Sequence, residues 1–400
     1  MFRNAASLIA GSVFTASGWA QVQMVNAAVV PEKYTMAVAN PRYAPHANES
    51  RIDVVFVLDT TGSMGGLIEG AKQKIWEIAN RIATAQPHPV IRMGLVAYRD
   101  RGDEYVTKLT ALTTDLDAVY SGLMGLAAGG GGDGPESVNQ ALNEALTKFE
   151  WDAGEKTLRL IYLVGDAPPH MDYSQDQLYS ETCERAAKAG VIVNTVQCGG
   201  DPETARVWQE IARSAEGNYV AIEQKGGVVA IATPFDAEIA ELGRKIDATV
   251  IGYGTKESQM EQAQRMSESG RLAAGAPSAA KADRAVFKSG AAGEGAVGGR
   301  QELVNDLKAG KVQVRELKDE ELPPEMQKLS VEEREKYVME KAKEREAIQK
   351  HIVDLNVKRQ KFMDEERAKL GVKTDSFDAA VFRALREQAQ KKGIQFPEAK

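Results

Sequence analysis

Short apolar runs alternate with amphipathic segments between Arg51 and Asp247. The runs are nearly continuous in Val, Ile and Leu, as expected of strands covered on both faces. They predict buried strands at Ile52–Leu58, Ile91–Tyr98, Leu158–Val164, Val191–Gln197 and Tyr219–Ile222. The amphipathic segments predict helices at Leu67–Thr84, Leu116–Ala127, Glu136–Phe149, Gln175–Ala189, Glu203–Ser214 and Phe235–Ile246. This alternation indicates a three-layer, doubly wound, Rossmann-like α/β fold with a mostly parallel sheet over residues 51–250.

The segment Tyr105–Leu112 departs from the alternation. It follows the strand at Ile91–Tyr98 after a short polar turn, which leaves no room for the crossover helix that a parallel neighbour requires. We therefore predict that it is an antiparallel edge strand.

The composition changes in the second half of the chain. Residues 251–300 are rich in Ala, Gly, Ser and Lys and show little periodic apolarity, which predicts a flexible linker. Residues 301–400 are predicted to form a charged, α-helical C-terminal extension. Within it, Ser330–Glu333 has the form of a capping box, and helix-forming residues continue from there to Leu370.

One face of that long helix carries a weak coiled-coil pattern. Its apolar positions follow a three-four spacing, at Ile348, Ile352, Leu355 and Phe362. Arg345 and Arg359 interrupt this seam. We therefore expect at best a weak coiled coil, and a helical hairpin with Phe377–Lys392 is the simpler prediction.

The N-terminus reads MFRNAASLIAGSVFTASGWA. A positive residue, a short apolar stretch and a small-residue cleavage site predict a secretory signal at residues 1–20, followed by a linker at 21–50. We expect the protein to be exported, either to a periplasm or outside the cell. No later segment is long and apolar enough to predict a membrane span in the mature chain.

Composition narrows the possible functions. The chain has 400 residues, 43% of them hydrophobic, and a net charge of −7. An acidic balance argues against a broad nucleic-acid-binding surface and is compatible with cation binding. The two cysteines, Cys183 and Cys198, are predicted either to form one disulfide in an oxidising compartment or to be two small buried side chains.

Oxygen-bearing side chains follow the first predicted strand. Asp59, Thr61 and Ser63 stand at alternate positions directly after its apolar run. Ligands of doubly wound sheets lie beyond the carboxyl ends of the strands. One carboxylate with two hydroxyls suits a hard cation such as Mg²⁺, Mn²⁺ or Ca²⁺. The alternative is that Asp59 or Ser63 only caps the next helix.

Two further loops supply acids to the same predicted edge. Asp133 and Glu136 lie in GGGGDGPES before a predicted helix, and Asp166 lies in LVGDAPPH after a buried strand. Each also has a local explanation, as a helix cap, a first-turn acid or a turn former. Their shared location favours a metal site.

These three stretches together resemble the metal-ion-dependent adhesion site of von Willebrand factor A domains. The resemblance covers about Arg51 to Asp247 and implies that Asp59, Thr61, Ser63 and Asp166 are metal ligands. The threonine that many members supply from the intermediate loop is missing. Asp133–Glu136 instead resembles the Asp-x-Pro-Glu of integrin β subunits, which implies Glu136 as the ligand and Asp133 as the second choice.

The resemblance also implies a function. A cation in such a site keeps a coordination position for an Asp or Glu of a partner protein, so divalent-cation-dependent protein binding is expected. The loop containing Arg99, Asp100 and Asp103 would either contact the partner or organise the rim by ion pairing.

No nucleophile, base and orienting residue can be assembled from the sequence, so we expect a binding protein rather than an enzyme. Two alternatives stay open. One is an accessory or scaffold subunit of a multi-protein complex that docks through its C-terminal helices. The other is an unrecognised metal-dependent hydrolase.

Overall fold

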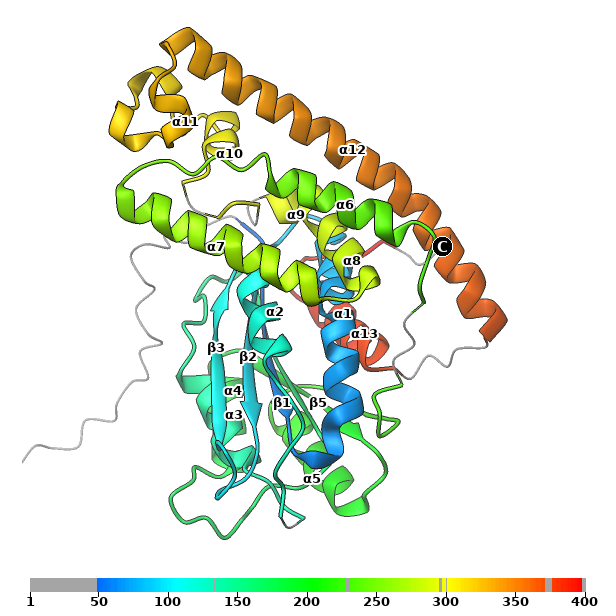
Figure 1. The fold of residues 1–400 in the computed structure, drawn as a ribbon. Coiled ribbons are helices and arrows are strands. Elements are labelled where there is room, and N and C mark those ends of the chain that lie inside the picture. Colours follow the sequence, from blue (N-terminus) through cyan, green and yellow to red (C-terminus); the bar gives the residue numbers. More distant parts are fainter. Residues whose placement is uncertain are drawn as a thin grey trace, which may run out of the picture. The chain divides into compact units, whose positions relative to one another are not determined.

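A computed structural model describes residues 49–132, 134–227, 231–294, 297–299, 301–370 and 376–397. Its centre is a six-stranded sheet in the order β3-β2-β1-β4-β5-β6 (Figure 1). The strands are β1 (Arg51–Asp59), β2 (Val90–Tyr98), β3 (Thr107–Thr113), β4 (Thr157–Gly165), β5 (Val191–Cys198) and β6 (Tyr219–Ile222). All neighbouring pairs are parallel except β2–β3. The prediction of a mostly parallel sheet with one antiparallel edge strand is confirmed.

Helices cover both faces of this sheet. They are α1 (Gly65–Ala83), α2 (Leu116–Met124), α3 (Val138–Thr147), α4 (Tyr179–Lys188) and α5 (Pro202–Ser214). A sixth helix, α6 (Asp236–Asp247), follows β6 and packs mainly on helices of the C-terminal part of the chain. Side chains of α1 and α2 share one apolar cluster with alternate residues of β1, and side chains of α3, α4 and α5 share another with the intervening residues. Because successive strand side chains point to opposite faces, a strand covered twice has to be apolar throughout. This is why the apolar runs predicted the strands well.

Residues beyond 250 form further helices. They are α7 (Lys256–Gly275), α8 (Ser278–Ser289), α9 (Ala291–Glu294), α10 (Leu303–Lys308), α11 (Pro324–Gln327), α12 (Val331–Leu370) and α13 (Phe377–Gln390), with 3₁₀ turns at Val314–Glu316 and Asp319–Glu321. Another 3₁₀ turn, at Gly62–Met64, precedes α1. The predicted C-terminal helices are therefore present.

The predicted flexible linker at 251–300 is wrong for most of its length. α8 packs against α1 and α6, and Ala282, Ala285 and Phe287 are buried in the apolar clusters. The amide of Asn80, near the end of α1, donates to the Asp283 carbonyl (2.8 Å). The small residues that suggested a linker instead allow close helix packing: a Cβ added at Gly243 of α6 would lie 2.7 Å from Ala285 Cβ.

The seam of α12 packs on the rest of the chain. Ile348, Ile352 and Leu355 join the apolar cluster of α6 and α8. The arginines that interrupt the seam are buried and paired. Arg359, 1% exposed, donates to Asp236 Oδ1 and Asp283 Oδ1, both at 2.6 Å. Arg345 binds both carboxylate oxygens of Glu302 at 3.0 Å. The seam therefore mediates intramolecular packing.

The predicted hairpin between α12 and α13 is not what the structure shows. α13 packs on α1, β4 and β5, whereas α12 packs on α6, α8 and α10. Phe377 of α13 is 2% exposed and lies against Phe56, with ring centroids 6.1 Å apart. Asn194 of β5 and Gln388 of α13 exchange two side-chain hydrogen bonds of 3.0 and 2.7 Å. The C-terminal helix therefore completes the core of the α/β domain.

Of the two alternatives predicted for Cys183 and Cys198, the structure shows two buried side chains and no disulfide. Both thiols are free and buried. Cys183 belongs to the apolar cluster of α3, α4 and α5, whereas Cys198 belongs to the cluster on the other face of the sheet. The sheet separates the two side chains, so each serves as a small apolar core residue, and burial raises both pKa values.

The signal and the N-terminal linker predicted before residue 49 lie outside the described residues. Within the described part of the chain, no helix is both long and apolar enough to cross a bilayer.

Candidate metal centre

Three loops meet at the carboxyl edge of the sheet. Asp59 ends β1, and Asp166 follows β4, its parallel neighbour. The loop before α3 joins them through its backbone: the Glu136 amide donates to the Pro168 carbonyl (2.9 Å), and the His170 amide donates to the Glu136 carbonyl (3.0 Å). The sheet order and this short pairing bring together acids that are far apart in the sequence.

Asp59 is fully buried, and its two carboxylate oxygens differ. Oδ1 accepts from the Thr61 amide (2.8 Å) and the Thr61 hydroxyl (2.7 Å). Oδ2 accepts no hydrogen bond from the described residues. The Thr61 hydroxyl also lies 3.5 Å from the Ser63 hydroxyl. The first loop is thus arranged around Asp59, and it leaves one buried oxygen available to a ligand.

Glu136 also has a buried carboxylate oxygen without a hydrogen-bond partner among the described residues. It is 3% exposed, and its Oε2 is buried and has no hydrogen-bond partner in the described part of the structure. The glycine run passes close beside it. At Gly131, where φ is +77°, an added Cβ would lie 3.0 Å from Glu136 Oε1 and 3.1 Å from Thr61 Cβ. Glycine is required here both for the backbone conformation and for this close approach.

Burial and mutual repulsion disfavour the charged forms of both acids. Burial raises the pKa of Asp59 to about 7; the hydrogen bonds from Thr61 oppose the rise, and the Asp166 charge adds to it. Burial, followed by repulsion from Asp59, Asp100 and other nearby acids, raises the pKa of Glu136 to about 9. Buried acids with unpaired oxygens and raised pKa values are typical of side chains that a bound cation can compensate.

Asp166 is only half-buried, and residues that belong to none of the predicted motifs hydrogen-bond to it. Its Oδ2 accepts from Gln224 Nε2 (2.6 Å), and the Thr204 hydroxyl lies 3.2 Å from its carbonyl. Gln224 is a site residue that the sequence did not predict, because a lone glutamine after a short strand carries no motif.

Tyr98 and Gly165 also shape the site without a sequence signal. The Tyr98 hydroxyl is buried, and its pKa is raised by burial and by the charge of Asp59. A Cβ added at Gly165 would lie 2.6 Å from that hydroxyl and 3.0 Å from Asp59 Oδ2. Only glycine leaves room for Asp59 in this position.

Arg99, Asp100 and Asp103 organise the loops. Arg99, 6% exposed, donates to the carbonyls of Thr60 (3.2 Å) and Ala127 (2.7 Å). Asp100, 5% exposed, accepts from the hydroxyls of Ser137 and Tyr173, and Asp103 Oδ2 accepts from the Gly131 amide (3.0 Å). Direct partner contact by Arg99 and Asp100 is therefore not supported, because their side chains are buried in these interactions.

The donor set fits a hard cation that uses hydroxyl ligands. Asp133 lies outside the described residues. In the described part of the chain, no three His, Cys, Asp or Glu side chains converge on one point. A cation would therefore depend on the hydroxyls of Thr61 and Ser63 as well as on the acids, and such all-oxygen sets suit Mg²⁺, Mn²⁺ or Ca²⁺.

A pocket of about 480 Å³ opens beside these residues. Thr61, Ser63, Glu136 and Asp166 line it, together with the start of α5. A protein side chain can therefore approach the predicted metal ligands from solvent.

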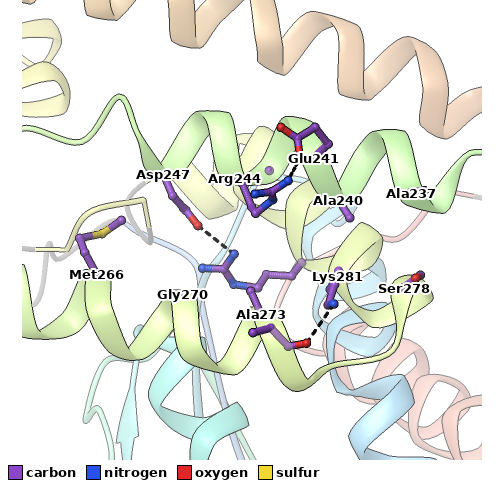
Figure 2. Close-up of a pocket in the computed structure, with 13 residues that line it drawn as sticks. Ala237, Ala240, Glu241, Arg244, Asp247, Met266, Gly270, Ala273, Ser278 and Lys281 are labelled. Carbon is purple, nitrogen blue, oxygen red and sulfur yellow. Dashed lines mark hydrogen bonds and ion pairs between the residues drawn. The ribbon is translucent and has the colours of Figure 1, made fainter.

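A larger pocket of about 670 Å³ lies between α6, α7 and α8 (Figure 2). Its charged side chains are already paired: Arg244 with Glu241, and Arg284 with Asp247. The Lys281 ammonium group donates to the Ala274 carbonyl. Among the described residues that line this second pocket, no buried side-chain oxygen lacks a partner. The pocket lined by Thr61, Ser63, Glu136 and Asp166, called the metal pocket below, is therefore the stronger candidate for the functional site.

Comparison with known proteins agrees with this fold. Residues 53–234 match the family model of the von Willebrand factor A domain. This part of the chain is therefore similar to von Willebrand factor A domains. Its helical C-terminal extension lies beyond the matched residues.

Curated relatives match about a third of this chain. Human von Willebrand factor A domain-containing protein 7 is 33% identical over 138 residues, which are 34% of this chain and 14% of that protein. An ariadne-like RING finger protein of Acanthamoeba polyphaga mimivirus is 28% identical over 123 residues, which are 31% of this chain and 12% of that protein. The chain thus spans a small part of these relatives.

Among solved structures, the SpRpn10 VWA domain matches with 15% identity and a TM-score of 0.34, covering 44% of this chain and 89% of that one.

Proposed function

We propose that the chain is a non-enzymatic, exported protein-binding module whose von Willebrand factor A domain binds a partner through a divalent cation. Such domains commonly mediate protein–protein interaction. Asp59, Thr61 and Ser63, with one or both of Glu136 and Asp166, would hold the ion, for which Mg²⁺ is our first choice and Mn²⁺ or Ca²⁺ the alternatives. When bound, the ion would supply a Lewis-acidic position for an Asp or Glu carboxylate of the partner.

One observation carries the proposal. Asp59 and Glu136 each bury a carboxylate oxygen that accepts no hydrogen bond from the described residues. Glu136 lines a pocket together with Thr61 and Ser63, and Asp59 lies behind this lining, hydrogen-bonded to Thr61. Burying an unpaired carboxylate is costly unless a cation or a proton compensates it. The start of α5 and the loop after β4 form the other wall and would set which partner fits.

Metal binding should depend on pH. In the metal-free protein the pKa of Asp59 is raised from 3.8 to about 7, so this group stabilises the fold most below about pH 4 and loses that contribution as pH rises through 7. Glu136 acts in the same sense up to about pH 9. Because the ion requires the charged forms, the increase in melting temperature caused by Mg²⁺ should be larger at pH 8 than at pH 6.

Calorimetry checks the same linkage independently. Titrating Mg²⁺ in two buffers of different ionisation enthalpy should reveal net proton release near pH 6.5 and less release at pH 8.5. A melting-temperature increase that does not change between pH 6 and pH 8, with no proton release, would contradict the assignment of Asp59 as a ligand.

A second candidate function is docking through α12. Met339, Val353 and Val357 of this helix are 54%, 51% and 68% exposed. Val353 and Val357 stand four residues apart and therefore share one outward face. Such a face could bind another protein without any metal, as a scaffold subunit would.

A pull-down separates the two candidates. Full-length chain immobilised in Mg²⁺ should retain a partner from an extract of the source organism, and excess chelator should release it. The double variant Val353→Glu and Val357→Glu should retain the same partner. Retention in chelator, together with loss in the double variant, would reject the metal site in favour of α12.

A further inference from the structure

Every charged side chain among the described residues that line the metal pocket is acidic. Beyond Glu136 and Asp166, these are Asp201 and Glu203 at the start of α5. Neither of the two is needed as a metal ligand in the site described above. Lys225 is close in sequence to Gln224, but it lies against Gly66 of α1 and does not line the pocket.

The two additional acids are positioned at the pocket mouth. Asp201 caps α5: its Oδ2 lies 2.6 Å from both the amide and the hydroxyl of Thr204. The same Thr204 hydroxyl lies 3.2 Å from the Asp166 carbonyl, which fixes the start of α5 against the β4 loop. Glu203, in the first turn, is exposed.

Charge balance makes these acids relevant to the partner. Asp59, Glu136 and Asp166 carry three negative charges when ionised, so a divalent ion leaves the centre with a net charge of about −1. A partner carboxylate adds another negative charge, and Asp201 and Glu203 add two more nearby. An isolated acidic side chain would meet repulsion at this rim, whereas an acid accompanied by a base would not.

A second feature shows that the pocket is built for a ligand. Glu136 is only 3% exposed and lines the same pocket as Asp201 and Glu203, yet its Oε2 has no partner among the described residues. The acidic mouth therefore belongs to a pocket that already contains an unsatisfied polar group.

We infer that the partner presents its carboxylate beside a lysine or arginine, and that Glu203 together with Asp201 binds this base. The inference rests on the proposed function, because the carboxylate is what places the base at the start of α5. It makes the α5 acids specificity-determining residues, and it narrows the partner to a segment with an acid and a base close together.

A displayed library of random peptides tests the inference. We would select binders on the full-length chain in Mg²⁺ and discard those that also bind in chelator. The peptides that remain should contain an Asp or Glu with a Lys or Arg within a few residues. The same selection on the double variant Asp201→Asn and Glu203→Gln should return acidic peptides without the excess of bases. Asn keeps the helix cap, so the variant should fold.

Affinities of one selected peptide complete the test. Replacing its base with Gln should weaken binding to the wild-type chain by about two- to fivefold, as expected for an exposed ion pair, and should not affect binding to the double variant. Glu210→Gln, on α5 but away from the pocket, is the matched control and should behave like wild type. If the magnesium-dependent peptides are acidic but show no excess of Lys or Arg, this inference is wrong and the proposed function stands. The absence of any magnesium-dependent peptide would overturn the proposed function with it.

Discussion

Replacing Asp59 with asparagine should abolish stabilisation by Mg²⁺ without unfolding the protein. The Asn side-chain oxygen can keep the two hydrogen bonds from Thr61, while the amide group takes the place of Oδ2, which has no partner among the described residues. The change also removes a buried carboxyl group, whose pKa is raised to about 7 and which is therefore charged at pH 8. Since one pKa unit corresponds to about 1.4 kcal/mol, the metal-free variant should be more stable than the metal-free wild type at pH 8.

Thermal melts with and without Mg²⁺ measure both effects. At a magnesium concentration 100 times the dissociation constant, the wild type should gain about 2.7 kcal/mol, whereas the variant should gain nothing. Asp354→Asn, an exposed change on α12, serves as the control and should respond to Mg²⁺ like the wild type. If the Asp59 variant were stabilised by Mg²⁺ as much as the wild type, Asp59 would not be a ligand.

Replacing Arg359 with methionine should destabilise the whole α/β domain. The change leaves Asp236 and Asp283 buried without the guanidinium group that binds both. Breaking a buried ion pair by removing one partner costs about 3–5 kcal/mol. Arg359 joins α12 to α6 and α8, and α8 packs on α1. Loss of these ion pairs should therefore lower the unfolding midpoint of the entire protein in urea.

Neutralising the two aspartates that pair with Arg359 should restore much of the lost free energy of unfolding. In the triple variant, Asp236→Asn and Asp283→Asn accompany Arg359→Met, so no unpaired charge is left buried. Lys336→Met, on the exposed side of α12, should leave the free energy of unfolding nearly unchanged. An unfolding curve of Arg359→Met that matches the wild type would show that α12 is not integral to the domain.

These contacts limit what truncation can reveal about the C-terminal helices. Deleting residues from Leu322 onward would remove α13, whose Phe377 lies against Phe56 and whose backbone accepts a hydrogen bond from Tyr162. Exposure of that apolar face would destabilise the domain and would abolish binding of any kind. Surface variants of α12 therefore separate scaffold function from metal-dependent binding more cleanly than a deletion does.

The fold of the α/β domain could be predicted because each strand is covered twice. Burial on both faces forces continuous apolar runs, and these mark β1, β2, β4 and β5 within one or two residues of their observed ends. The region after residue 250 was harder to interpret. Its Ala and Gly residues are typical of linkers, yet here they allow helices to approach closely, as Ala285 does against Gly243 of α6.

In the site, residues that are neighbours in the sequence could be predicted, whereas residues brought together only by the fold could not. Asp59, Thr61 and Ser63 could be predicted together because they stand on one loop directly after a strand. Gln224 and Tyr98 could not, since only the folded sheet brings them to Asp166 and Asp59. The roles of Arg99 and Asp100 depended on burial, which a charged pair in a polar turn does not reveal.

The central claim is that a divalent cation binds between the loop after β1 and the acids of the two neighbouring loops. A crystal structure of the protein grown with Mn²⁺, with anomalous difference maps recorded at the manganese edge, tests it most directly. The account predicts a single strong peak in the metal pocket, in contact with Asp59, Ser63 and at least one of Glu136 and Asp166. Well-ordered side chains around the pocket, with no anomalous peak at saturating Mn²⁺, would contradict it.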